Sequence, residues 1–256
     1  MKAYSLFSGS SGNCFFVDGG NDKILIDCGV CARNVENALA SLGVSIRDIS
    51  AIFVTHEHID HTKGLEVISK HHHIPTYMTE KTARALITDP RASLLSDLYL
   101  FDGEFSVKIG AFTVSAFFTS HDSACPVGYT VEKDGIKLGF ATDTGYVTEN
   151  EKKALVGCRA VLVEANHDTV MLELGPYPFD LKRRIKSDIG HLSNTDCAEF
   201  CRFLCENGTK SILLGHISKD NNTPSLAVET VKQALVAFPD VTVAAASRKE
   251  ITELII

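Results

Sequence analysis

The stretch THEHIDH at residues 55–61 decides the fold of this chain, because it places four side chains that can bind metal within six positions. It follows AIFVT at residues 51–55, whose apolar and β-branched composition predicts a buried strand. His56 and His58 are two positions apart, so both point to the same side of an extended segment. We expect a helix to follow at residues 63–70.

The donor atoms of this stretch predict more than one metal ion. Neutral imidazole suits zinc, iron or manganese, and the carboxylate of Asp60 adds tolerance of harder cations. With His61 added, the set is too rich for one tetrahedral ion, so we expect two ions about 3.5–4 Å apart. The zinc-protease motif H-E-x-x-H fails here, because Asp60 stands where its second His would be. By contrast, His71, His72 and His73 follow no strand end, and we interpret them as solvated loop residues.

Three other β-rich runs each end shortly before a further residue of the same kind. Residues 112–118 precede His121, residues 137–141 precede Asp143, and residues 211–214 precede His216. Sites gather in the loops at one edge of a sheet, so we expect these strand ends to converge. Earlier runs are expected at residues 4–8, 14–18 and 23–27, with a hairpin turn at 19–22 and a helix at 32–42.

The bulk composition sets the class of protein. The 256 residues are 45% hydrophobic and show no linker, repeat or low-complexity block, so we expect a single domain over residues 1–256. No apolar run reaches 18 residues and the N-terminus lacks a signal-peptide core, which argues against a membrane protein. The eight cysteines form no disulfide pattern, so we expect a reduced, cytoplasmic setting. Cys197, Cys201 and Cys205 recur every four residues and predict one buried helix face.

The motif H-x-H-x-D-H, followed in order by single His, Asp and His residues, resembles the metallo-β-lactamase fold superfamily over essentially the whole chain. The resemblance implies an α/β fold, an αββα sandwich of two mixed β-sheets flanked by helices, with the site at one edge. The implied metal ligands are His56, His58 and His121 for one ion, Asp60, His61 and His216 for the other, and Asp143 as the bridge. Asp27, at the end of an early strand, would orient a ligand by hydrogen bonding.

Further stretches resemble the YycJ/WalJ branch of that superfamily, stand-alone bacterial proteins described as phosphodiesterases or DNA exonucleases. They include EANHD at 164–168, LKRRI at 181–185, GHLSN at 190–194 and LGHISK at 214–219. The branch implies a dinuclear metal-dependent phosphodiesterase that acts on DNA as a 5′–3′ exonuclease. The two divalent ions would be zinc or manganese, with iron also compatible. His167 stands where the branch has Tyr, so no role is carried onto it.

The expected chemistry needs a proton donor as well as metal ions. Two divalent ions would lower the pKa of a shared water, so that hydroxide attacks phosphorus. The leaving alkoxide then needs a proton, which His191 can carry with a reference pKa of about 6.5. Ser193 is the expected N-cap of a helix at 194–207, which would anchor His191. His191 and Asp60 are therefore the candidate catalytic residues, although His191 could instead only cap backbone groups at the helix start.

Several polar side chains are candidates for contact with substrate phosphate. The loop at residues 8–13 could present backbone N–H groups or could be only a tight turn between strands. The basic run at 182–186 could contact the nucleic-acid backbone or could be a solvated helix face. The named candidates are Asn13, Lys182, Arg183, Arg184 and Ser193.

Other functions remain open from the sequence. The formal net charge of −7 argues against broad adhesion to nucleic acid and keeps a small-molecule or cyclic-nucleotide phosphodiesterase as the alternative. A non-haem iron oxidoreductase is disfavoured, because flavodiiron proteins have Glu where His58 stands. A regulatory protein without activity is disfavoured by the intact set of metal-binding residues.

Overall fold

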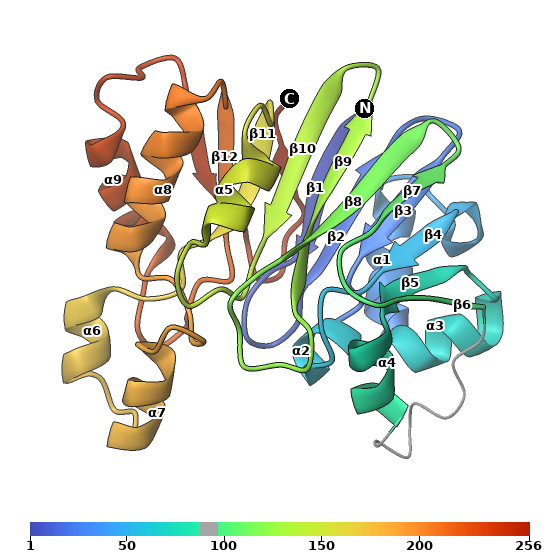
Figure 1. The fold of residues 1–256 in the computed structure, drawn as a ribbon, viewed down its shortest axis with the longest axis horizontal. Helices are drawn as coiled ribbons and strands as arrows, with labels where there is room; N and C mark the ends of the chain where they lie inside the picture. Colours follow the sequence, from blue (N-terminus) through green and yellow to red (C-terminus); the bar gives the residue numbers. More distant parts are fainter. Residues whose placement is uncertain (88–96) are drawn as a thin grey trace.

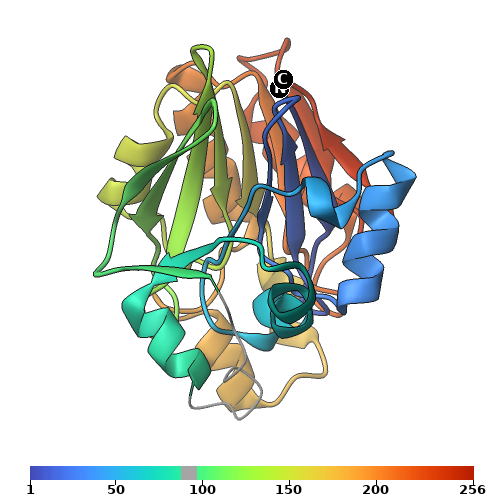
Figure 2. The same ribbon diagram turned by 90° about the vertical axis from the view of Figure 1, so that its right-hand side faces the viewer.

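Two seven-stranded mixed β-sheets pack face to face between outer helices in the computed structural model, which describes residues 1–87 and 97–256 (Figure 1). The first sheet has the strand order β14-β1-β2-β3-β4-β5-β6, and the second has the order β13-β12-β11-β10-β9-β8-β7. Figure 2 shows the blue strands of the first sheet and the green strands of the second in separate layers. The expected αββα sandwich is confirmed.

The strands follow the apolar runs of the sequence closely. The first sheet contains β1 (Lys2–Phe7), β2 (Cys14–Asp18), β3 (Lys23–Ile26), β4 (Ala51–Phe53), β5 (Thr76–Thr79), β6 (Leu98–Phe101) and β14 (Thr252–Leu254). The second contains β7 (Ser106–Ile109), β8 (Phe112–Phe118), β9 (Val127–Lys133), β10 (Ile136–Ala141), β11 (Ala160–Glu164), β12 (Ser211–Gly215) and β13 (Thr242–Ala245). The expected hairpin joins β2 to β3, where Asp18 pairs with Lys23.

Helices cover the outer face of each sheet. Those of the described residues are α1 (Ala32–Ser41), α2 (Ile59–Thr62), α3 (Leu65–His72), α4 (Glu80–Ile87), α5 (Glu149–Leu155), α6 (Thr169–Leu174), α7 (Phe179–Ile185), α8 (Asn194–Glu206) and α9 (Pro224–Ala234), with a 3-10 turn at Ile46–Asp48. Apolar residues of α1, α3 and α4 pack on the first sheet. Those of α5, α8 and α9 pack on the second, and the three cysteines of α8 are buried there as predicted.

The core between the sheets is built from alternate strand residues, as expected of a sandwich. Phe15 and Phe53 of the first sheet meet Phe112 and Tyr129 of the second, and all four are buried. The Tyr129 hydroxyl donates to the Val54 carbonyl at 2.7 Å, which ties the second sheet to the strand end that precedes the motif at 55–61.

The prediction that His71, His72 and His73 lie in a loop is wrong for the first two, which complete α3. The helix ends only at His73, whose left-handed backbone (φ 51°) closes it just before Ile74 and Pro75. His71 and His73 are exposed as expected, while His72 lies 3.0 Å from a Glu36 carboxylate oxygen. No helix among residues 1–87 and 97–256 is long and apolar enough to cross a membrane.

Candidate metal centre

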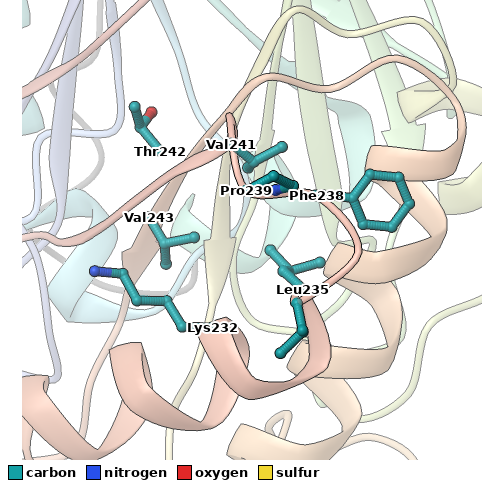
Figure 3. A pocket seen from close by; sticks show the side chains of 8 residues that line it. Lys232, Leu235, Phe238, Pro239, Val241, Thr242 and Val243 are labelled. Carbon is teal, nitrogen blue, oxygen red and sulfur yellow. The ribbon is translucent and has the colours of Figure 1, made fainter.

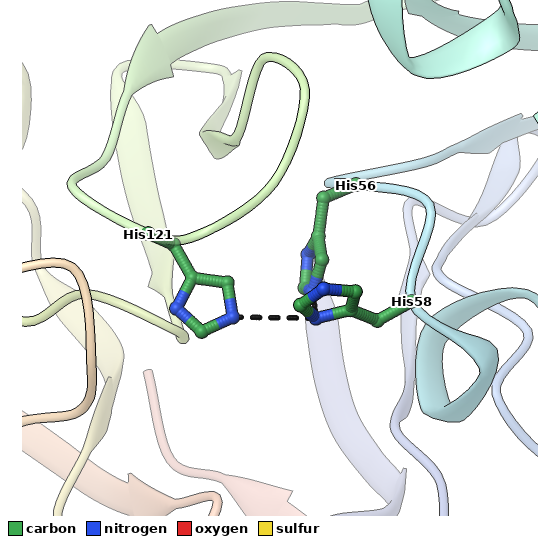
Figure 4. Close-up of side chains that lie close together, drawn as sticks. All are labelled: His56, His58 and His121. Atoms are coloured by element: carbon green, nitrogen blue, oxygen red, sulfur yellow. Dashed lines mark hydrogen bonds between the residues drawn. The ribbon is translucent and has the colours of Figure 1, made fainter. Parts of the chain in front are cut away.

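One group of three imidazoles gathers between the two sheets at the edge where their strands end. His56 and His58 lie in the loop after β4, and His121 lies in the loop after β8 (Figure 4). Nε2 of His56 is 3.1 Å from Nδ1 of His58, which is 3.3 Å from Nε2 of His121. Three nitrogen atoms thus converge on one point, and their spacing suits ligands of a common ion.

A second group lies beside the first and combines a carboxylate with two imidazoles. Asp60 and His61 lie in the short helix α2, and His216 follows β12. An Asp60 carboxylate oxygen is 3.7 Å from Nε2 of His61 and 3.5 Å from Nε2 of His216. These three atoms form another set that could hold a metal ion.

Asp143, which follows β10, reaches both groups. Its carboxylate oxygens lie 3.2 Å from Nε2 of His61 and 3.8 Å from Nε2 of His121. One of these oxygens and Nε2 of His216 are buried without any hydrogen-bond partner among the described residues. Buried polar atoms are costly unless satisfied, so these orphaned atoms fit a pair of cations between the groups.

The electrostatics of the site favour bound positive charge. Burial, and then the charge of His61, hold the pKa of His56 well below its ordinary value, so His56 presents the neutral form that binds metal. Burial opposes the charged form of His61 too, but Asp143 and Asp27 outweigh it and raise its pKa to about 10. The carboxylates around His61 therefore stabilise positive charge at this position, whether it is a proton or a metal ion.

Strained backbone marks three residues of the site. Asp27, Asp143 and His216 have φ between 51° and 60°, in the left-handed region that non-glycine residues rarely adopt. Each follows a strand directly or within one residue, so the sharp turn swings its side chain inward. Such strain persists where surrounding contacts enforce it, commonly at functional sites.

Asp27 lies where the sequence predicted a residue that orients a ligand. It is fully buried, and one carboxylate oxygen accepts from Nδ1 of His61 at 2.7 Å. It also accepts from the Thr55 backbone N–H at 2.8 Å and the Thr55 hydroxyl at 2.9 Å. These contacts leave Nε2 of His61 directed at Asp60 and Asp143.

Glu164 is a site residue that the sequence analysis missed. It ends β11 and is fully buried, and one carboxylate oxygen accepts from Nδ1 of His191 at 2.8 Å and from Nδ1 of His216 at 2.7 Å. The other oxygen faces the backbone N–H groups of Thr144 and Leu192. Burial opposes ionisation of Glu164, but the two imidazoles, that of His191 foremost, lower its pKa to about 2.

Through these two bonds Glu164 orients both imidazoles, and with Asp143, His191 and His216 it also forms a further set of donors that could hold a metal ion. His191 lies beside the metal-binding groups, with Nδ1 3.7 Å from an Asp143 oxygen. A signal was available in the sequence: Glu164 is an acidic residue at the end of the apolar run AVLV, a fifth strand end of the kind already recognised.

The sequence also did not predict a set of buried asparagines beside the site. The Asn222 side-chain amide donates to the carbonyl of Ala165 at 2.9 Å and to the side-chain oxygen of Asn194 at 2.7 Å. Asn194 donates back to Asn222 at 3.0 Å, and the Asn166 amide donates to the His216 carbonyl at 3.0 Å. This asparagine clasp, made of Asn166, Asn194 and Asn222, joins the loops that carry Glu164, His191 and His216.

The candidates for phosphate contact fall into different places. The Asn13 amide lies 3.0 Å from Nε2 of His61, while its oxygen accepts from the Gly9 backbone N–H, so the loop at 8–13 is a closed turn against the site. Ser193 is the predicted N-cap of α8, and its hydroxyl is engaged with Asp196. Arg184 pairs with Asp122, which lies 3.4 Å from Nε2 of His121.

The side chains of the other two basic candidates on α7 contact residues on or near that helix and not the metal centre. Lys182 donates to the Glu173 carbonyl at 2.6 Å, and Arg183 donates to an Asp180 carboxylate oxygen at 3.1 Å. Of the three α7 candidates, Arg184 is the one whose contacts with the described residues reach the site.

Known proteins resemble this chain in sequence and in fold. Residues 22–217 match the family described as Beta-lactamase superfamily domain. The exodeoxyribonuclease YycJ of Bacillus anthracis is 38% identical over 230 residues, covering 90% of this chain and 87% of YycJ. The exodeoxyribonuclease WalJ of Streptococcus pneumoniae is 37% identical over 237 residues, covering 92% of this chain and 88% of WalJ.

Solved structures agree on the fold. The metallo-β-lactamase fold protein YhfI from Bacillus subtilis superposes with a TM-score of 0.74 at 14% identity, over 98% of each chain. The short form of human tRNase Z superposes with a TM-score of 0.69 at 17% identity, over the whole of both chains. At such low identity these two structures support the architecture alone.

Proposed function

Because this chain belongs to the metallo-β-lactamase superfamily and, within it, to the family of YycJ and WalJ, we propose that it is a dinuclear metal-dependent phosphodiesterase that degrades DNA as a 5′–3′ exonuclease. The observation that carries the proposal is the pair of donor groups joined by Asp143, with His191 held beside them by Glu164. Two divalent ions, zinc or manganese, fit these donors, and iron is also compatible.

The residues of the chain divide the work of the reaction. His56, His58 and His121 would hold one ion, Asp60, His61 and His216 the other, and Asp143 would bridge them. Bound there, the ions would supply Lewis-acid chemistry and lower the pKa of water. Asp27 and Glu164 keep the imidazoles of His61 and His216 turned so that Nε2 faces inward.

His191 is proposed as the proton donor to the leaving oxygen. Its Nδ1 is committed to Glu164, so Nε2 is the ring nitrogen left to face substrate. The Glu164 carboxylate holds the His191 ring in one orientation, as a positioned proton donor requires. Arg184, held by Asp122 beside His121, is proposed to contact a phosphoryl oxygen. Asp60 retains its candidacy as a catalytic residue as well as a ligand, being partly exposed at the site.

Purified protein with Mn²⁺ or Zn²⁺ tests the proposal on end-labelled single- and double-stranded DNA, beside bis-p-nitrophenyl phosphate and a cyclic nucleotide. We expect mononucleotides to be released from the 5′ end. Hydrolysis of the small esters alone would replace the nuclease by the small-molecule phosphodiesterase. Metal analysis is expected to give two ions per chain, and iron with consumption of oxygen would contradict both hydrolase functions.

The variant His191→Ala tests the proton donor separately. We expect kcat to fall about 10²–10⁴-fold, as for loss of a general acid, while two metal ions remain bound. An unchanged kcat with unchanged metal content would exclude this role of His191.

A further inference from the structure

A hollow of about 510 Å³ lies next to the metal centre, outside the second sheet. Its walls come from α5, α8 and the loops at residues 145–147 and 186–188. This volume is in the range of pockets that hold small molecules. We call this hollow the α5–α8 pocket.

The α5–α8 pocket shares its loops with the metal centre. Tyr146, which lines it, is three residues from Asp143, and Asp188 is three residues from His191. The Gly145 backbone N–H donates to the Ser120 carbonyl at 2.7 Å, and the Ser120 hydroxyl donates to the Asp188 carbonyl at 2.7 Å. These bonds join the pocket wall to Ser120, the residue that precedes His121. The pocket wall is therefore hydrogen-bonded to a loop that carries a metal-binding residue.

Glycine at position 145 makes this close approach possible. A Cβ there would come within 2.3 Å of the Asp188 backbone and 2.6 Å of the Gly190 nitrogen. The loops that carry Asp143 and His191 therefore pack backbone to backbone beside the pocket.

The lining offers aromatic faces with cations beside them. The Tyr146 side chain is 50% exposed, and its backbone carbonyl is held by the Thr144 hydroxyl at 2.9 Å. The Lys152 ammonium lies 5.8 Å from the centre of the Phe203 ring. Aromatic rings that stack on bases, with cations for the backbone, are the usual means of binding single-stranded nucleic acid.

The cations of the pocket are available to a ligand. Lys152 pairs with Glu149, Lys186 with Glu173, and Arg202 lies 3.9 Å from Glu206, and all of these pairs are at the surface. Exposed ion pairs contribute little to stability, so a phosphate can replace the carboxylate at small cost.

Carboxylates also line the pocket and restrict the kind of ligand that it can bind. Asp188 and Glu199 are exposed in the wall and would repel a chain of phosphates. They can accept from the exocyclic amino group of a base, as carboxylates do from cytosine. The lining therefore suits one nucleotide with its base inside and its phosphate at the rim.

We propose that the α5–α8 pocket binds one nucleotide of the DNA strand under degradation, with the base stacked on Tyr146 and the adjoining phosphate near Lys152. This inference rests on the proposed nuclease function and adds a site for the strand beyond the scissile phosphate. It predicts that substrates too short to reach the pocket are bound more weakly than longer strands.

A second hollow provides matched control variants. It has about 470 Å³ and lies at the far end of the second sheet, between the end of α9 and β13 (Figure 3). It is also lined by an aromatic residue and a lysine, Phe238 and Lys232. Because none of its lining residues takes part in the metal centre, Lys232→Ala matches Lys152→Ala in charge without touching the site.

The test compares Tyr146→Ala, Tyr146→Phe, Lys152→Ala and Lys232→Ala in the metal-loaded protein. KM for a single-stranded oligonucleotide is expected to rise about 5- to 20-fold in Tyr146→Ala, the loss typical of one stacked base, and to return to near the wild-type value in Tyr146→Phe. Lys152→Ala should raise KM and weaken its dependence on salt, and Lys232→Ala should do neither.

Hydrolysis of bis-p-nitrophenyl phosphate, which has no base to place in the pocket, separates the possible failures. Wild-type protein that does not cleave DNA would overturn the nuclease function itself. Wild-type protein that cleaves DNA with the same KM as Tyr146→Ala would overturn the nucleotide pocket alone. An equal loss on DNA and on the small ester would also overturn it, since the change would then lie in the metal centre.

Discussion

The two sheets supply the metal centre in different ways. The first contributes one continuous motif at residues 55–61, supported by Asp27. The second contributes single residues from separate loops, namely His121, Asp143, Glu164, His191 and His216. We call these two sets the first and the second half of the metal centre. Local chain geometry fixes the first half, while the second half depends on contacts between loops that are distant in sequence.

Buried polar contacts take the place of sequence proximity in the second half. Glu164 joins the loops of His191 and His216, and Asn222 joins the same loops from behind. Such networks are stabilising only when each member is satisfied. We therefore expect the second half to be the more sensitive to conservative changes of its supporting residues.

Among the supporting residues, the largest effect is expected from Glu164→Gln compared with Asp27→Asn, since each removes one buried carboxylate from one half of the metal centre. Glu164 faces four donors, so either orientation of the Gln amide directs N–H groups at other donors. We expect phosphodiesterase kcat to fall about 100-fold in Glu164→Gln and about 10-fold in Asp27→Asn.

Metal titration shows whether each variant acts through the metal ligand that the lost carboxylate orients, His61 for Asp27 and His216 for Glu164. Asp27→Asn is expected to weaken the ion near His61, and Glu164→Gln to weaken the ion near His216 and also to displace His191. A more damaging Asp27→Asn variant would reverse the proposed difference between the halves.

The next effect is expected from Asn222→Ala. It leaves the Ala165 carbonyl and the Asn194 amide without a buried partner, which costs about 1–3 kcal/mol of the free energy of unfolding. Urea unfolding measures that loss, and kcat should fall several-fold with little change in KM, since the ligand loops shift and no substrate contact is lost.

Two further variants give this prediction its controls. Asn222→Asp keeps the shape but loses the donor, so it should not restore kcat. Asn207→Ala removes an exposed side-chain bond to the Phe203 carbonyl at the end of α8 and should leave kcat unchanged. An Asn222→Asp protein as active as wild type would show that the donor of the asparagine clasp has no role in positioning.

The difference between the halves also explains what the sequence could predict. The strand ends and their convergence follow from apolar runs and spacing, which are local, while the αββα sandwich follows from the resemblance to the superfamily. Glu164 ends an apolar run as the other strand-end residues do, but its role depends on donors 27 and 52 residues away that only the fold brings to face it. The asparagine clasp has no local pattern for the same reason.

The C-terminal end of α3 shows the opposite limit. Helix ends depend on cap geometry, and α3 ends only at the left-handed His73, two residues later than the sequence predicted. The roles of the seven metal-binding residues, of Asp27 and of the phosphate candidates remain predictions that metal analysis and mutation can test.

The smallest effect on activity is expected from Glu151→Gln, which should change stability instead. Glu151 is a second buried carboxylate on the side of the second sheet, and it is hydrogen-bonded to Thr148 in the capping box of α5 and to the side chain of Thr144. Burial raises its pKa to about 7 from the ordinary 4.5. The folded state therefore binds this proton more tightly than the unfolded state, and the stability it contributes is present below pH 4.5 and lost as pH rises through 7.

Thermal unfolding at pH 5 and pH 8 measures this contribution as a difference between variant and wild type, since other groups titrate in both. Gln keeps the oxygen that accepts from the Thr148 N–H but carries no charge, so Glu151→Gln should gain up to about 3 kcal/mol relative to wild type at pH 8 and much less at pH 5. An equal Tm difference at both pH values would show that Glu151 is ionised throughout. In either case kcat should stay at the wild-type value, because Glu151 makes no contact with the imidazoles that Glu164 orients.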